Sequence, residues 1–313
     1  MKAAIGGAIV TAIVFSFRVA GGADLQVGPQ AAQAPPATDV FLADLQTSQA
    51  TKISDNPGYD NQPGFSPDGA FVLYTSNRDG KQTDIFRYDI GAKATTQVTH
   101  TSESEYSPTV TPDGKTFSVI RVEADGTQRL WRFDLDGANP NLVLENVKPV
   151  GYHVWIDATH LGLFVLGANN QPPTLQIADT KTGTAAVVAT NIGRGMRMRQ
   201  NSTGNLVFVS KAETPWVIKE YSPSTGQTST LTAVVEGSED FAWDVINNKE
   251  ALLMARGSKV HAWSPALPTW RELADYSSSG VGSITRIAVR PGDPSRQPHM
   301  ALVGTGRPPG PQK

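Results

Sequence analysis

The sequence contains no cysteine, which excludes disulfide bonds, thiolate nucleophiles, cysteine-ligated zinc and iron–sulfur clusters. It also lacks an excess of charge of one sign, since 27 basic and 29 acidic side chains in 313 residues give a net charge of −2. A chain this close to neutrality has no basic surplus that would favour nucleic acid or an anionic membrane surface. We therefore expect stability to come from packing, and partners other than nucleic acid.

The residue patterns of common hydrolytic and metal sites are missing as well. The five histidines, at positions 100, 153, 160, 261 and 299, show none of the paired spacings typical of zinc ligands. No G-x-S-x-G motif occurs, so nothing in the sequence indicates a self-contained serine peptidase. These absences favour a binding protein over an enzyme.

Long apolar runs are confined to the N-terminus. Lys2 precedes the uncharged stretch 3–17, and small residues follow at 20–23, a pattern typical of a secretory signal peptide. The run is shorter than the roughly 20 residues that a membrane-spanning helix needs. We expect residues 1–23 to be a signal peptide and the protein to be exported, to the periplasm or outside the cell. Arg18 leaves an uncleaved anchor as the alternative.

Two motifs recur with one period of 45 residues. Asp68 in GFSPDG and Asp113 in TVTPDG are separated by that distance. A second set of β-like stretches keeps the same register in its aromatic residues (Phe41, Phe86, Trp131) and its aspartates (Asp44, Asp89, Asp134, Asp179). Because two independent motifs share one period, the chain is predicted to consist of structural repeats.

Each repeat divides into four short stretches with the period-two alternation of β-strands, in the clearest copy PGFSP, AFVLYTS, DIFRYDI and TTQVTH. The SPDG segment predicts a tight turn, because proline presets φ, aspartate bonds nearby backbone and glycine accepts a positive φ. Four strands in about 45 residues are the signature of a propeller blade.

Five complete repeats cover about residues 60–100, 105–146, 150–190, 195–232 and 239–275. Residues 38–54 contain only a third and a fourth strand, and 283–304 only a first and a second. The sequence therefore predicts an all-β, six-bladed propeller, closed by N-terminal outer strands pairing with C-terminal inner strands, which removes free sheet edges. We assign residues 24–37 to a linker, 38–305 to the propeller and 306–313 to a disordered tail.

The segments FSPDG with DIFRYDI, and SPTVTPDG with RLWRFDLDG, resemble the WD40-like (PD40) repeat of TolB-type periplasmic propellers over roughly residues 38–304. This resemblance implies an exported six-bladed propeller that works in envelope protein complexes. The residues that match are Phe65–Gly69, Pro112–Gly114 and the two aromatic–aspartate strands DIFRYDI and RLWRFDL, and the role that the resemblance implies for them is structural. The propeller is expected to begin near Thr38, so contacts made by the N-terminal domain of the best-known member are not carried over.

The loops that lead into the first strand of each blade are expected to ring one mouth of the central channel. Binding residues concentrate on loops held by a rigid scaffold. Six segments meet there: 56–63, 102–107, 147–153, 191–197, 236–241 and 279–286. The candidate ligand-binding residues are Asp60, Glu105, Tyr152, His153, Arg194, Arg197, Glu239, Asp240 and Arg286, with Tyr106 beside them. Arginine forks bind carboxylates well, which suits a polar ligand or a peptide terminus.

Three of these residues carry two interpretations each. His153 titrates near neutral pH in its free form, so it is either an acid/base group or a hydrogen-bonding residue that joins a neighbouring blade. Arg194 and Arg197 either bind a ligand or form ion pairs between blades.

Two functions stay open. The first is an exported, monomeric binding or scaffold module for an envelope protein or peptide, without a cofactor and without a membrane span after signal removal. The second is a metal-dependent small-molecule hydrolase or lactonase, with His153 and Glu105 as catalytic residues. Its channel calcium would take ligands from Asp60, Asn61, Glu105, Glu239 and Asp240. The absence of a catalytic motif favours the first.

Overall fold

The structure is a computed structural model that describes residues 37–78, 80–199, 204–246, 249–292 and 295–306. The predicted signal peptide and nearly all of the predicted linker lie outside the described residues, as do residues 307–313. Gly306, which the sequence analysis assigns to the tail, is instead the last residue of a strand, because it pairs with Val281. No helix in the described part of the chain has the length and apolar character needed to cross a membrane.

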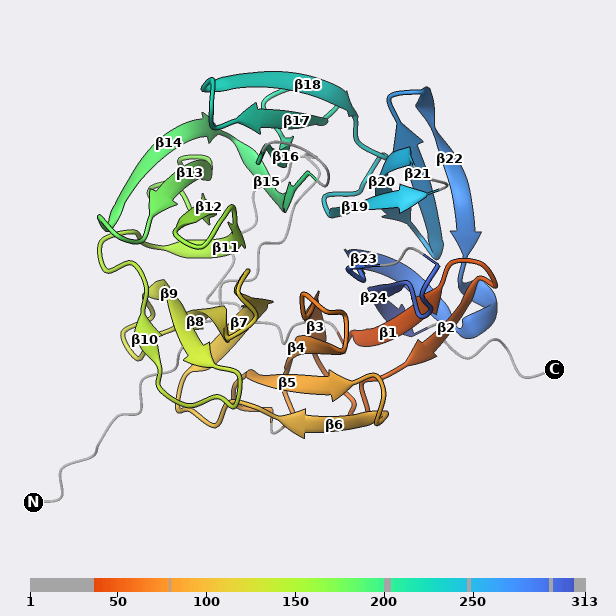
Figure 1. Ribbon diagram of the computed structural model, residues 1–313, viewed down its shortest axis with the longest axis horizontal. Coiled ribbons are helices and arrows are strands. Elements are labelled where there is room, and N and C mark those ends of the chain that lie inside the picture. The colour runs from red at the N-terminus through yellow and green to blue at the C-terminus, as the bar shows by residue number, and fades with distance from the viewer. Residues whose placement is uncertain (1–36, 79, 200–203, 247–248, 293–294, 307–313) are drawn as a thin grey trace, which may run out of the picture.

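The described strands form six four-stranded antiparallel sheets, arranged as the blades of a ring (Figure 1). Blade 1 contains β3 (Asp60–Phe65), β4 (Phe71–Ser76), β5 (Asp84–Asp89) and β6 (Ala94–Gln97). Blade 2 contains β7 (Ser104–Val110), β8 (Thr116–Val122), β9 (Gln128–Asp134) and β10 (Asn141–Leu142). Blade 3 contains β11 (Val150–Trp155), β12 (His160–Val165), β13 (Thr174–Asp179) and β14 (Thr184–Thr190).

The second half of the ring repeats this plan. Blade 4 contains β15 (Ile192–Met198), β16 (Leu206–Ser210), β17 (Val217–Ser222) and β18 (Gln227–Ala233). Blade 5 contains β19 (Phe241–Ile246), β20 (Lys249–Arg256), β21 (Lys259–Ser264) and β22 (Leu267–Asp275). Blade 6 contains β23 (Val281–Val289), β24 (Met300–Gly306), β1 (Asp39–Asp44) and β2 (Gln49–Lys52), preceded by the short helix η1 (Ser277–Ser279).

The ring closes through blade 6, which takes strands from both ends of the described chain. β1 pairs antiparallel with β24, with Val40 opposite Val303 and Phe41 opposite Leu302. All four side chains are buried. The predicted architecture and its closure are therefore confirmed. Sharing one sheet between the two ends gives each of them hydrogen-bonded neighbours and a buried face.

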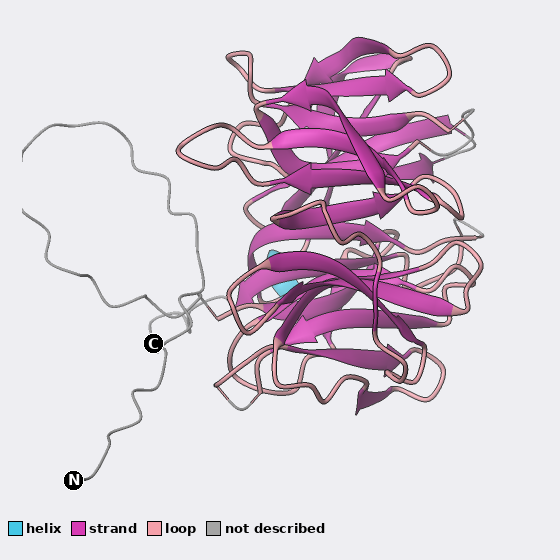
Figure 2. Cartoon of the chain, turned by 90° about the vertical axis from the view of Figure 1, so that its left-hand side faces the viewer, coloured by secondary structure: helices cyan, strands magenta, loops and turns pink. Residues whose placement is uncertain are grey.

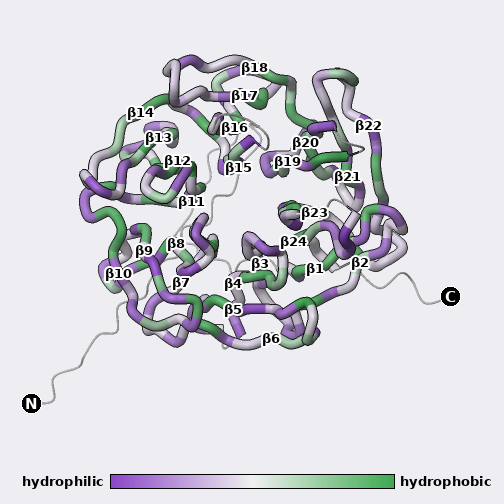
Figure 3. The backbone as a smooth tube through the Cα atoms, in the orientation of Figure 1, coloured by the Kyte–Doolittle hydropathy of each residue, from purple (hydrophilic) through white to green (hydrophobic). Residues whose placement is uncertain are grey.

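Apolar faces of neighbouring blades form the core between them. Phe71, Leu73 and Ile85 of blade 1 pack with Phe117 and Phe133 of blade 2. Corresponding clusters join the other blades, and hydrophobic and hydrophilic segments alternate around every blade (Figure 3). In side view the loops project from both faces of the disc, so the blades support two separate loop surfaces (Figure 2).

The two SPDG-like turns adopt the conformation that the sequence predicts. Asp68 Oδ1 accepts hydrogen bonds from Ser66 Oγ at 2.6 Å and Ala70 N at 3.0 Å. Asp113 Oδ1 accepts the equivalent bonds from Thr111 Oγ1 at 2.7 Å and Lys115 N at 3.1 Å. The glycine of each turn has a positive φ, near 70°. The repeated residues are thus structural, as the resemblance implies.

Candidate functional site

The six inner strands, β3, β7, β11, β15, β19 and β23, surround the centre of the ring (Figure 1). Each contributes a segment to the lining of one cavity of about 250 Å³. We call the end of this channel at which the inner strands begin the upstream mouth. The charged side chains that line the cavity are Arg194, Arg197 and Arg286, and no carboxylate is among the lining residues that the structure describes.

The inner strands are bulged where they face the channel. The pairing register shifts between Asn61 and Gly64 in β3, and between Tyr106 and Thr109 in β7. Gln62 and Ser107, one repeat apart and each followed by proline, have positive φ values of 56° and 55°. Gln62 Oε1 accepts a hydrogen bond from Ser107 N at 2.9 Å, which ties the two bulges together. Bulges re-aim side chains, and here they shape the channel wall.

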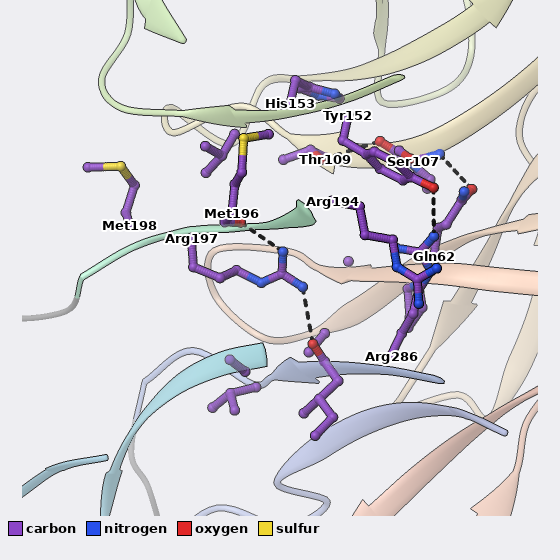
Figure 4. Close-up of a pocket in the computed structure, with 18 of the residues that line it drawn as sticks. Gln62, Ser107, Thr109, Tyr152, His153, Arg194, Met196, Arg197, Met198 and Arg286 are labelled. Atoms are coloured by element: carbon purple, nitrogen blue, oxygen red, sulfur yellow. Dashed lines mark hydrogen bonds between the residues drawn. The ribbon is translucent and has the colours of Figure 1, made fainter. Parts of the chain in front are cut away.

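Arg286 forms the centre of the polar contacts at the upstream mouth (Figure 4). Its Nε donates to Asn61 Oδ1 at 2.8 Å, and its Nη2 donates to the Tyr152 hydroxyl at 3.0 Å. Its Nη1 lies 3.4 Å from Asp240 Oδ2. One side chain of blade 6 is therefore bonded to blades 1, 3 and 5. Asn61 was named in the sequence analysis only as a calcium ligand, but its Oδ1 accepts from an arginine.

Asp240 precedes β19 and is shared by two arginines. Arg197 Nη2 lies 3.1 Å from its Oδ1, on the other side from Arg286. The Asp240 side chain is only 3% exposed, so its charge is compensated mainly by these two guanidinium groups. Arg197 also donates to the backbone carbonyls of Met196 and Ile287. Both of its interpretations remain compatible with this geometry, because it is an ion-pair partner that also lines the cavity.

Arg194 reaches the channel from the bulge of β15. Its backbone N–H donates to Glu239 Oε1 at 2.8 Å, and Lys211 Nζ lies 2.7 Å from the same oxygen. The flanking glycines allow this approach, since a Cβ on Gly195 would lie 2.5 Å from the Glu239 carbonyl oxygen. The sequence analysis did not name Lys211 as a partner of this site, and no spacing pattern marks it.

Asp60 and Glu105 are not brought to the cavity. Asp60 is fully buried, beside the Ser76 hydroxyl. Burial raises the pKa of Asp60 to about 6. Glu105 is also fully buried and accepts from Thr99, Thr101 and Arg121. Burial raises its pKa to about 7, against the opposite effect of these donors.

His153 joins two blades. Its Nε2 lies 2.7 Å from Ser118 Oγ of blade 2, and Trp155 Nε1 donates to the same hydroxyl at 2.9 Å. Burial lowers the pKa of His153 to about 3, so the imidazole is neutral across the physiological range. Among the described residues, His153 and Glu105 form no hydrogen bond or ion pair with each other. Within the ranges that the structure covers, no group of three histidine, aspartate or glutamate side chains is placed to hold a metal ion.

The upstream mouth therefore joins six of the nine candidates, Tyr152, Arg194, Arg197, Glu239, Asp240 and Arg286, and His153 lines the same cavity. Tyr106 packs against the cluster of blades 2 and 3. The arrangement offers guanidinium and phenol donors to a ligand.

Comparison with known proteins supports the fold. Residues 30–148 match the family model PD40, the TolB beta propeller domain. A segment of 108 residues is 24% identical to an uncharacterized protein of Agrobacterium fabrum and covers 32% of this chain and 36% of that protein. The match thus spans about a third of the relative's length. The resemblance to TolB-type propellers is confirmed by these matches and by the structures below.

Three solved structures share the fold. A putative TolB from Agrobacterium tumefaciens has a TM-score of 0.65 and 15% identity, covering 86% of this chain and 98% of that one. A chain of a nidogen/laminin complex has a TM-score of 0.61 and 12% identity, covering 86% and 99%. A gluconolactonase from Xanthomonas campestris has a TM-score of 0.60 and 8% identity, covering 87% and 98%. At these identities the likeness concerns the fold alone.

Proposed function

We propose that this six-bladed propeller of the TolB-like kind is an exported binding module, which holds a protein or peptide of the cell envelope at the upstream mouth of its channel. The observation that carries the proposal is the convergence of Arg194, Arg197 and Arg286 with Tyr152 around one mouth. These side chains come from blades 3, 4 and 6, so the closed ring holds them in fixed positions. A rigid scaffold that presents several hydrogen-bond donors suits recognition of a polar partner.

The relatives support a binding role in different degrees. The nidogen/laminin structure is, by its name, a propeller within a protein complex. The resemblance to TolB-type propellers supports a place in the cell envelope. The apolar N-terminal run that follows Lys2 supports export. We infer a monomer that uses a loop-bearing face of the disc, with no resident cofactor.

A hydrolase is the competing proposal, because the gluconolactonase has the same fold. In this chain, the two residues proposed as catalytic for a hydrolase have separate partners. His153 contacts Ser118, whereas Glu105 contacts Thr99, Thr101 and Arg121. Glu105 is also absent from the cavity lining. The arrangement favours binding because a general acid and base act on one substrate only when both reach it.

Photo-crosslinking from the two mouths tests the proposal. A crosslinking residue at Ser102, exposed on the loop before β7, reports on the upstream mouth. The same residue at Lys115, exposed on the turn between β7 and β8, is the matched control on the opposite mouth of the same blade. We expect a discrete adduct in the envelope fraction from position 102 only. Equal adducts from both positions, or none from either, would contradict the proposal.

A further inference from the structure

Arg194 uses few of its hydrogen-bonding groups. An arginine has five N–H donors. The Arg194 side chain makes one hydrogen bond, from Nη2 to the Thr285 carbonyl oxygen at 3.1 Å. Its Nε is buried and has no partner among the described residues. Arg286 differs, because its Nε, Nη1 and Nη2 each contact a different residue. Arg194 and Arg286 therefore have different roles.

The charges around Arg194 leave a positive excess. Four cationic side chains, from Arg194, Arg197, Lys211 and Arg286, surround two carboxylates. Asp240 is taken by Arg197 and Arg286, and Glu239 is held by Lys211 and by the backbone N–H of Arg194. In the part of the chain that the structure describes, no acidic oxygen lies within 4 Å of the Arg194 guanidinium. Glu239 interacts electrostatically with both Lys211 and Arg194, so the four cations outnumber the two carboxylates and the mouth carries a net positive charge.

The position of Arg194 is preset by the backbone. Gly193 and Gly195 let β15 lie against Glu239, where a Cβ on either residue would come within 3.0 Å of a Glu239 oxygen. The register of β15 shifts between Ile192 and Met196, so Arg194 sits in the bulge. The bulge fixes the Cα of Arg194, and the hydrogen bond from Nη2 to the Thr285 carbonyl oxygen restrains the guanidinium, so less freedom is lost when a ligand binds.

From these contacts we infer that Arg194 is the ligand-binding residue of the upstream mouth and receives a carboxylate, with Arg286 as the residue that positions the mouth around it. The inference rests on the proposed binding function and specifies its ligand chemistry. A carboxylate matches a guanidinium through two parallel N–H···O bonds, and the Nη1–Nη2 end of Arg194, which lines the cavity, offers such a pair. The carboxylate is supplied by a peptide C-terminus or by a small organic acid.

The test compares the full mature chain with three variants. Arg194→Gln removes the charge and the fork, and Arg194→Lys keeps the charge without the fork. Arg132→Ala removes a matched charge from an exposed position on β9, away from the channel. The probes are a hexapeptide library with free C-terminal carboxylates, the same library with C-terminal amides, gluconate and inorganic phosphate. Retention on immobilised protein is read by mass spectrometry, and affinity by calorimetry.

We expect carboxylate probes to bind wild type and Arg132→Ala equally. Arg194→Gln should lose about 10- to 100-fold in affinity, with Arg194→Lys in between. Preference for free-acid peptides over amides identifies a peptide terminus, and binding of gluconate identifies a small acid. Three results overturn the inference. They are binding of phosphate alone, equal binding of amide and free-acid peptides, and carboxylate binding that Arg194→Gln does not weaken. If Arg194→Gln still forms the adduct at position 102 but no carboxylate probe binds the protein, the proposed ligand chemistry is wrong and the proposed binding function stands.

Discussion

Arg286 Nη2 donates a hydrogen bond to the hydroxyl of Tyr152 at 3.0 Å, between residues 134 positions apart in the sequence. The two residues belong to blades 6 and 3, which lie opposite each other in the ring (Figure 1). The guanidinium carbon also lies 5.1 Å from the centre of the tyrosine ring. The contact crosses the channel, so the upstream mouth is held together by side chains as well as by the closure of blade 6.

Replacing Arg286 should destabilise the whole ring. Arg286→Met removes the bonds to Asn61, Tyr152 and Asp240 and leaves a buried carboxylate with a single cationic partner. We expect the free energy of unfolding to fall by about 2–4 kcal/mol, measured by urea denaturation. Tyr152→Phe removes one hydroxyl and should cost about 1 kcal/mol. Unchanged stability in Arg286→Met would show that the cross-channel contacts do not hold the mouth.

A methyl group at Gly195 should disturb the site directly. The new Cβ would lie 2.5 Å from the Glu239 carbonyl oxygen, so β15 must move away from β19. We expect Gly195→Ala to lose about 1–3 kcal/mol of stability, with weaker binding at the mouth. Gly91→Ala is the control, since its Cβ meets only Asp89 Oδ1 at 3.5 Å, an ordinary contact. Equal stability of the two variants would refute the close approach.

Asp60 and Glu105 should make stability fall as the pH rises. Their pKa values, about 6 and about 7, exceed the ordinary values of 3.8 and 4.5, so the folded state favours the protonated forms. Their contribution is fully present below about pH 4 and is lost as the pH rises through 6 and 7.

Wild type should lose free energy of unfolding between pH 4 and pH 8 because these two carboxyls ionise. The variants Asp60→Asn and Glu105→Gln should each reduce this loss by on the order of 1–3 kcal/mol. Glu145→Gln, at an exposed position, is the control. Chemical denaturation across this pH range measures the difference. A pH profile unaltered by either variant would mean that these carboxyls are charged in the folded protein.

His153 has the opposite pH dependence. Its pKa is lowered from 6.5 to about 3 by burial, so folding requires the neutral imidazole. The stability that it contributes is present above pH 6.5 and is lost as the pH falls toward 3. We expect its ring resonances in ¹⁵N spectra to stay constant between pH 5 and 8. A midpoint inside that interval would restore His153 as an acid/base candidate.

Removal of metal should leave the protein unchanged. For residues 24–313 purified without chelator, the proposed function predicts less than a stoichiometric amount of divalent ion and the same melting temperature with and without EDTA. About one equivalent of calcium, together with a lower melting temperature after chelation, would favour the hydrolase and direct mutagenesis to His153, Glu105 and Glu239.

The sequence alone predicted the fold because the information for it is local and repeated. The turn around Asp68 recurs 45 residues later around Asp113, and each aspartate bonds its own turn. Alternating apolar residues define the strands, and the incomplete repeats at the two ends indicate the shared sixth blade. The bulges at Gln62 and Ser107 were not predicted, although the proline after each is a usable signal.

Tertiary structure decided which candidates meet. Asp60, Glu105 and Asp240 stand at equivalent repeat positions, separated by multiples of 45 residues, and the sequence treats them alike. Asp60 is buried beside Ser76, and Glu105 is surrounded by Thr99, Thr101 and Arg121. Only Asp240 meets Arg197 and Arg286, which come from the blades on either side of its own. A repeat determines where a side chain lies within its blade, but its charge partners come from other blades, and only the closed ring brings these together.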